Sequence, residues 1–289
     1  MKRQDYSSEN PAANNIKGQL KEAKNIGDFL SCWLENRLLE SPHQEVFDKY
    51  YWSYRRHFGQ RMREAYSEQI KEAIELIKAR PEAKVLEIGF GLGTESLWLS
   101  MEGANVVAID ILGDFEKAAR RRKEILEQYI GQMLNCEFRR TSVMDLDEEE
   151  AYDVIWMEQA FHHLEPREAV VDKIVSLIKP GGHLVVSEVN ALNPLMQFQL
   201  FISRGTNMYF THVDEDGKKI LIGRERIVTA QRLRHIFAKR HVYCKSVRYF
   251  RIFPNHPIFD KFGRLEKLMA RNWMAPLQSH FNYVGQRKG

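Results

Sequence analysis

A short stretch of the chain contains the residue types of a ligand-binding turn: Glu87, Gly89, Gly91 and Gly93, within EIGFGLG. Glycine lacks a Cβ, so it lets the backbone turn sharply and lets a ligand lie against bare amide groups at a helix N-terminus. A carboxylate at Glu87 suits a ligand with an ammonium group and no pyrophosphate, because it would repel phosphates. Asp110 follows at about the separation expected of a carboxylate that binds ribose hydroxyls. The stretch therefore predicts a site for a ligand that contains a ribose and an ammonium group.

The elements that position these residues form a β-α-β unit. Residues 84–88 have strand character, a helix is predicted to begin at Thr94, and a second apolar strand ends at Asp110. A dinucleotide-binding fingerprint requires Gly or Ala at the sixth position of the turn, which Thr94 occupies here. Thr94 and Glu87 therefore disfavour an NAD(P)-dependent oxidoreductase, which stays as an alternative function.

Two motifs resemble those of class I S-adenosylmethionine (SAM)-dependent methyltransferases. The first is the E-x-G-x-G-x-G loop at 87–93. The second is LIKPGGHLVVSE at 177–188, similar to the L-x-P-G-G turn that precedes a strand in this family. Together the matches cover roughly residues 84–190. The resemblance implies an α/β fold, a doubly wound and mostly parallel Rossmann-like sheet of seven strands, with SAM as cofactor and S-adenosylhomocysteine as product.

The resemblance also implies roles on the cofactor side. Glu87 would bind the ammonium group, the three glycines would accommodate the amino-acid end, and Asp110 would hold the ribose hydroxyls. Ile111 would pack on the adenine, and Asp145 would accept a hydrogen bond from its amino group. Glu158, at the end of the fourth predicted strand, would approach the methionyl amine. A solvated loop acid is the alternative for Asp145.

The segment EQAFHHL at 158–164 is the candidate acceptor side, because ligands of doubly wound sheets bind at the carboxyl ends of strands. His162 is the candidate base for a hydroxyl acceptor, and His163 either contacts the substrate or holds the loop by backbone hydrogen bonds. Quinone O-methyltransferases of the family carry E-x-x-E-H here, sometimes linked to a divalent metal. Gln159 and His162 occupy the two acid positions in this chain, so no metal is expected.

Helices are predicted ahead of the first strand, after a flexible polar arm at residues 1–14. The first apolar residues at helical spacing predict two short helices, with a break and a new N-cap at Gly27-Asp28. Residues 43–79 predict a further helical stretch rich in aromatic rings, among them Tyr50 and Tyr51 as substrate-binding candidates. This stretch is interpreted as a lid over the cofactor. Packing of the rings onto the sheet is the alternative.

The chain is divided into an N-terminal arm and helical lid, 1–80, and a SAM-binding domain, 81–289, with an insert at 190–223. The insert predicts a helix after Pro194 and then a hairpin. Its aromatic residues, with Tyr209 as a substrate-binding candidate, predict an apolar acceptor pocket. A homodimer contact or a second small core is the alternative.

The segment after the insert predicts the last elements of the sheet. The hairpin turn is placed at Asp216-Gly217. A strand is predicted at 241–250, a helix at about 258–272 and a last strand at 280–287. The last strand fits the terminal antiparallel strand of the family.

The composition narrows the partners. A net charge of +4 over 289 residues is too small to predict a polyanionic partner, and the basic run from Lys117 to Lys123 is interpreted as a solvated helix face. The Asn/Asp-Pro-Pro-aromatic motif of nucleic-acid base methyltransferases is absent, so no nucleic-acid partner is expected. The chain shows no apolar run of membrane-spanning length, and its three cysteines form no CxxC pair. A cytoplasmic enzyme without a membrane partner is expected.

The expected function is methyl transfer from SAM to a small-molecule acceptor, aromatic or apolar, on oxygen or nitrogen. The reaction is an in-line substitution, in which positioning contributes about 7–11 kcal/mol, more than a single base contributes. A SAM-binding regulatory protein without turnover is the second alternative, since binding of the cofactor does not require catalysis.

Overall fold

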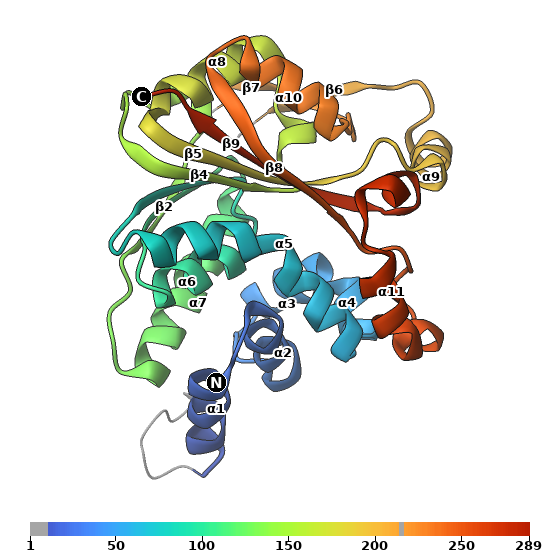
Figure 1. Cartoon of the computed structure of the whole chain (residues 1–289). Coiled ribbons are helices and arrows are strands. Elements are labelled where there is room, and N and C mark those ends of the chain that lie inside the picture. Colours follow the sequence, from blue (N-terminus) through green and yellow to red (C-terminus); the bar gives the residue numbers. More distant parts are fainter. Residues whose placement is uncertain (1–10, 214–216) are drawn as a thin grey trace.

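The computed structural model describes residues 11–213 and 217–289. Within these ranges, seven strands form one sheet in the order β3-β2-β1-β4-β5-β9-β8 (Figure 1). These strands are β1 (Lys84–Ile88), β2 (Asn105–Asp110), β3 (Cys136–Arg140), β4 (Tyr152–Glu158), β5 (Ile178–Val189), β8 (Val242–Phe250) and β9 (His280–Arg287). Strands β1 to β5 pair in parallel, whereas β9 pairs antiparallel with both β5 and β8. The predicted doubly wound sheet with its terminal antiparallel strand is confirmed.

Helices cover both faces of the sheet, because successive residues of a strand point to opposite sides (Figure 1). Val85 of β1 shares one buried cluster with residues of α5 (Gln60–Ala79), α6 (Thr94–Met101) and α7 (Gly113–Ile130). Leu86 shares the other with residues of α8 (Arg167–Leu177) and α10 (Ala230–Ala238). Among the described residues, no helix combines the length and apolar character needed to cross a membrane.

The N-terminal helices differ in their boundaries from the prediction. They are α1 (Pro11–Glu22), α2 (Ile26–Asn36), α3 (His43–Tyr50), α4 (Trp52–Arg56) and α5. Residues 1–10 of the predicted arm lie outside the described residues, and residues 11–14 belong to α1, so the arm prediction is wrong there. The stretch 43–79 is helical as predicted, but it divides at Tyr51 and at residues 57–59.

The predicted break at Gly27-Asp28 is wrong, because Gly27 lies inside α2. Asn25 is the N-cap, and its side chain accepts a hydrogen bond from the backbone N–H of Asp28 at 3.0 Å. A Cβ on Gly27 would lie 2.4 Å from the carbonyl oxygen of Arg63. The glycine therefore serves the close approach of α5 to α2 rather than the end of a helix.

The insert forms α9 (Pro194–Arg204), β6 (Tyr209–Val213) and β7 (Lys219–Gly223), as a helix and a hairpin. Residue Asp216 of its predicted turn lies outside the described residues. The prediction of one helix over 258–272 is wrong, because this segment forms η3 (Pro257–Phe262) and α11 (Gly263–Met269), followed by η4 (Asn272–Leu277). Long-range contacts override the helical pattern: the buried carboxylate of Glu266 accepts hydrogen bonds from the backbone N–H groups of Ile252 and Phe253 at 2.7 and 2.8 Å.

Candidate active site

A cavity of about 650 Å³ lies at the carboxyl ends of β1, β2 and β4. The glycine turn, the N-terminal helices and the β6-β7 hairpin all contribute to its lining. The predicted site residues that line it are Tyr50, Tyr51, Gly89, Gly91, Asp110, Ile111, Glu158, His162 and His163. The predicted site residues outside its lining are Glu87, Gly93, Asp145 and Tyr209. The fold thus gathers residues from distant parts of the sequence at one edge of the sheet.

The three glycines of the turn have positive φ angles, 83° at Gly89, 51° at Gly91 and 71° at Gly93, which L side chains rarely adopt. A Cβ on Gly91 would lie 2.4 Å from Oη of Tyr50, at the edge of the cavity. A Cβ on Gly93 would lie 2.6 Å from the ring of Phe138 in the core. Gly91 therefore keeps room at the cavity, whereas Gly93 serves the packing of β3 beneath α6.

Asp110 ends β2, and two backbone N–H groups hold its carboxylate. Gly91 donates to Oδ2 at 3.0 Å and Leu112 donates to Oδ1 at 3.1 Å. Burial raises the pKa of Asp110, although these hydrogen bonds counteract that effect. Each carboxylate oxygen can accept a second hydrogen bond, so the group suits a pair of ribose hydroxyls. Ile111 follows directly and adds apolar surface to the cavity.

Three acids stand around the glycine turn, of which Glu87 and Glu95 are buried and Glu158 is half-buried. Glu95 and Glu158 line the cavity, whereas Glu87 is buried behind it and accepts a hydrogen bond from Ser96. Burial, and then repulsion by Glu95, raises the pKa of Glu87 and raises the pKa of Glu158 to about 8. Glu95 is not among the predicted site residues, although an acid in the first turn of the helix after a glycine loop is a signal for it.

Glu158 is held on one side only. The side-chain amides of Gln69 and Gln159 both donate to Oε1 of Glu158, at 2.6 and 2.5 Å. A ligand in the cavity can therefore approach Oε2. Gln159 has a positive φ of 47°, which turns the chain sharply at the end of β4.

Local geometry places two predicted residues away from the cavity. Asp145 ends the 3-10 helix η1 (Val143–Asp145) and forms an ion pair with Lys218, while Val143 lines the cavity instead. Tyr209 of β6 is 44% exposed, and the next residue, Phe210, lines the cavity. The alternation follows from the two-residue period of a strand.

Tyrosines of the N-terminal helices contact the glycine turn and the helix after it. The hydroxyls of Tyr51 and Thr94 are hydrogen-bonded at 2.6 Å, and Tyr66 donates to Glu95. Tyr50 packs edge-on against Phe115, with ring centroids 5.3 Å apart. These contacts connect α3 and α5 to α6 and α7 beside the cavity, while the interpretation of the segment as a lid stays a prediction.

Arg122 departs from the predicted solvated face of α7, because its side chain is fully buried. It donates to the carbonyl oxygen of Leu92 and to Oγ1 of Thr94, both at 2.7 Å. Its guanidinium lies over the rings of Trp33 and Phe47, at 4.5 and 5.1 Å from their centroids. A single arginine therefore joins α7, the glycine turn and the N-terminal helices.

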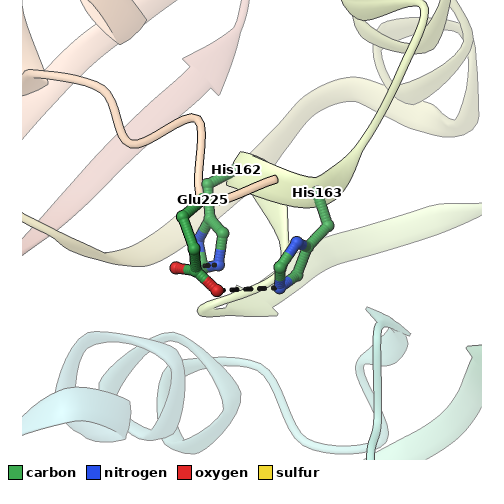
Figure 2. A group of neighbouring side chains, drawn as sticks. All are labelled: His162, His163 and Glu225. Carbon is green, nitrogen blue, oxygen red and sulfur yellow. Dashed lines mark ion pairs between the residues drawn. The ribbon is translucent and has the colours of Figure 1, made fainter. Parts of the chain in front are cut away.

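The 3-10 helix η2 (Phe161–His163) presents both histidines to the cavity. Nδ1 of His162 lies 2.7 Å from Oε2 of the fully buried Glu188, and Nδ1 of His163 lies 2.9 Å from the carbonyl oxygen of Gly223. Glu225, which follows β7, faces both rings (Figure 2). Glu188 and Glu225 are not among the predicted site residues, because nothing in the local sequence pattern connects them to η2.

The two imidazoles differ in their electrostatics. Burial opposes the charged form of His162, but Glu188 and Glu225 outweigh it and raise the pKa of His162. Burial, and then the neighbouring His162, lowers the pKa of His163.

The comparisons with known proteins agree with this geometry. Residues 86–186 match a family model described as a methyltransferase domain. Ubiquinone biosynthesis O-methyltransferase of Xylella fastidiosa is 36% identical over 110 residues, which is 37% of this chain and 42% of that protein. The enzyme of the same name from Xanthomonas axonopodis pv. citri is 34% identical over 122 residues, 40% and 48% of the two chains. The chain thus spans less than half the length of these curated relatives.

Solved structures share the fold. The magnesium protoporphyrin IX methyltransferase of Synechocystis PCC 6803, solved with bound S-adenosylhomocysteine, aligns with 85% of this chain and all of its own. Its TM-score is 0.55 at 13% sequence identity, a similarity that supports the fold alone. The predicted resemblance to class I SAM-dependent methyltransferases is confirmed.

Proposed function

We propose that this protein transfers a methyl group from SAM to a small-molecule acceptor. Its residues 86–186 match a methyltransferase domain, and its sheet has the class I SAM-dependent methyltransferase fold. The carrying observation is the cavity in which Asp110 and the glycine turn meet the buried Glu95 and the half-buried Glu158. SAM contains a ribose and an ammonium group, and this lining offers a carboxylate to each: Asp110 to the ribose and Glu158 to the ammonium group.

The cofactor residues keep most of their expected roles in this proposal. Asp110 holds the ribose hydroxyls, Ile111 packs on the adenine, and Glu158 binds the ammonium group. Glu87 acts from behind the turn, where it accepts a hydrogen bond from Ser96 of α6. Asp145 would reach the adenine only if its ion pair with Lys218 opened.

The acceptor side favours an aromatic hydroxyl compound. The lining there includes Tyr54, Phe210 and Leu221. The curated relatives are named ubiquinone biosynthesis O-methyltransferases. An acceptor oxygen attacks the methyl carbon while the carbon–sulfur bond breaks, so that SAM and R–OH give R–OCH₃, S-adenosylhomocysteine and a proton. His162, which Glu188 holds in place, takes that proton.

An acceptor screen tests the proposal. The protein is incubated with SAM and with phenols, catechols or anilines, and S-adenosylhomocysteine formation is followed by mass spectrometry. We expect turnover with at least one phenolic acceptor. Tight binding of SAM without turnover of any acceptor would favour the regulatory protein, and binding of NADH instead of SAM would favour the oxidoreductase.

Binding of SAM at pH 7 is expected to release up to about one proton per molecule bound. Glu158 has a pKa of about 8 in the free protein, so it is mostly protonated at pH 7, and a bound cation favours its ionised form. The release should shrink as the pH rises above 8, since Glu158 is then already ionised. Calorimetry in two buffers of different ionisation enthalpy measures it. If Glu158→Gln released as many protons on binding SAM as the wild type does, Glu158 would not be the group that ionises.

A further inference from the structure

Three side chains with metal-binding atoms meet at one corner of the cavity: His162, His163 and Glu225 (Figure 2). One such atom of each lies within 4.8 Å of the others. Oε2 of Glu225 is 3.5 Å from Nε2 of His162, and Oε1 is 4.0 Å from Nε2 of His163. Ligands about 2.0–2.2 Å from a tetrahedral ion lie about 3.4 Å from one another. The three groups can therefore converge on one ion after a small rotation of Glu225, whose side chain is 39% exposed.

The outer contacts of both histidines fit metal binding through Nε2. A metal-binding histidine usually donates its other ring N–H to a carboxylate or a backbone carbonyl, which fixes the tautomer. Here Nδ1 of His162 faces Glu188 and Nδ1 of His163 faces the carbonyl of Gly223. Each Nε2 then carries a lone pair toward Glu225. A single general base would account for one such ring, whereas a metal site accounts for both.

The fold holds Glu225 against η2 through close backbone contacts. The backbone N–H of Arg226 donates to the carbonyl oxygen of His162 at 3.3 Å. A Cβ on Gly223 would lie 2.6 Å from that same oxygen, so only glycine permits this approach. Glu225 itself has a φ of 52°, an unfavourable conformation that persists only where the surroundings enforce it. The hairpin therefore positions this carboxylate at the two imidazoles.

The charges and the donor types indicate the class of ion. Glu188 and Glu225 place two carboxylates beside the site, and the two imidazoles supply nitrogen donors. Nitrogen donors favour zinc and other first-row transition ions over Mg²⁺ and Ca²⁺, which prefer oxygen. Three protein ligands with an open fourth position is the arrangement of catalytic zinc sites. We propose that His162, His163 and Glu225 bind one divalent transition-metal ion of the zinc class, with its open position toward the acceptor.

The inference rests on the proposed function and gives the ion a role in it. An acceptor hydroxyl at the open position would have its pKa lowered, as bound water does on zinc. The O–H bond breaks and its proton leaves to solvent. The oxygen then bonds to the methyl carbon, and the electron pair of the broken carbon–sulfur bond stays on sulfur. With the ion bound, His162 is a ligand and the ion replaces it as the group that activates the hydroxyl, contrary to the expectation of a metal-free site.

A zinc titration of the whole, untagged protein tests the site. The protein is stripped with a chelator, exchanged into metal-free buffer and titrated with ZnCl₂ and, separately, MgCl₂ in a calorimeter. We expect one Zn²⁺ per chain, at least 100-fold tighter than Mg²⁺. Losing a residue that only hydrogen-bonds to a metal ligand lowers metal affinity by about 10–100-fold. His163 and Glu225 are themselves proposed ligands, so His163→Gln and Glu225→Gln should each lower the Zn²⁺ affinity by more than about 100-fold.

His212→Gln is the matched control, because His212 lines the same cavity without belonging to the cluster. It should bind Zn²⁺ as the wild type does. Every variant is also titrated with S-adenosylhomocysteine, which reports the fold and the cofactor site. Retained S-adenosylhomocysteine binding with no Zn²⁺ binding, or Zn²⁺ binding that Glu225→Gln leaves unchanged, overturns the metal site alone. If the wild type does not bind S-adenosylhomocysteine, the proposed function is overturned, whatever the zinc titration shows.

Discussion

Asp110→Ala is expected to weaken the binding of SAM and of S-adenosylhomocysteine by about 100-fold or more. In the proposed complex the carboxylate accepts two ribose hydroxyls, and each hydrogen bond to a charged group contributes about 1.5–3 kcal/mol. The substitution also removes the acceptor for the backbone N–H groups of Gly91 and Leu112. These hydrogen bonds stabilise the glycine turn before any ligand binds, so the turn is destabilised as well. Calorimetric titration of both ligands measures the loss.

Asp114→Ala is the matched control for this experiment. Asp114 lies shortly after Asp110 in the chain, but its side chain is 77% exposed, and among the described residues its one ion pair is a distant one with Lys117. Its removal should leave the affinity for SAM within about twofold, because an exposed pair contributes little. Asp110→Ala with near wild-type affinity would mean that the cofactor does not use the end of β2.

Arg122→Ala is expected to lower the free energy of unfolding by about 3–5 kcal/mol, the cost of breaking a buried polar network by removing one partner. The carbonyl of Leu92 and the hydroxyl of Thr94 would lose their buried donor, and the rings of Trp33 and Phe47 would face a void. Urea unfolding followed by tryptophan fluorescence measures the change.

Two further variants separate the causes of that loss. Lys117→Ala removes a side chain that is 60% exposed on the same helix, and it should stay within about 0.5 kcal/mol of the wild type. Arg122→Lys keeps the charge but not the planar guanidinium that lies over the rings of Trp33 and Phe47, so it should still be clearly destabilised. Wild-type stability in Arg122→Lys would show that the charge alone matters.

Much of the fold follows from local sequence. The strand at residues 84–88, the helix start at Thr94 and the strand end at Asp110 have the predicted positions, as does the last strand at 280–287. These elements carry their signals within a few residues: apolar runs buried on both faces, and glycines at positive φ. The structure of residues 258–272 does not follow from local sequence alone. The buried Glu266 in this segment accepts hydrogen bonds from the backbone N–H groups of Ile252 and Phe253.

The sequence by itself determined the glycine turn, Asp110 and the paired histidines, because each belongs to a motif whose residues are neighbours in the chain. Only the tertiary structure decided what surrounds them. It brought Glu188 and Glu225 to His162, buried Arg122 inside an apparently solvated basic run, and directed Asp145 to an ion pair outside the cavity. Such contacts join segments that are distant in sequence, and their geometry depends on how strands and hairpins pack, which no local spacing encodes.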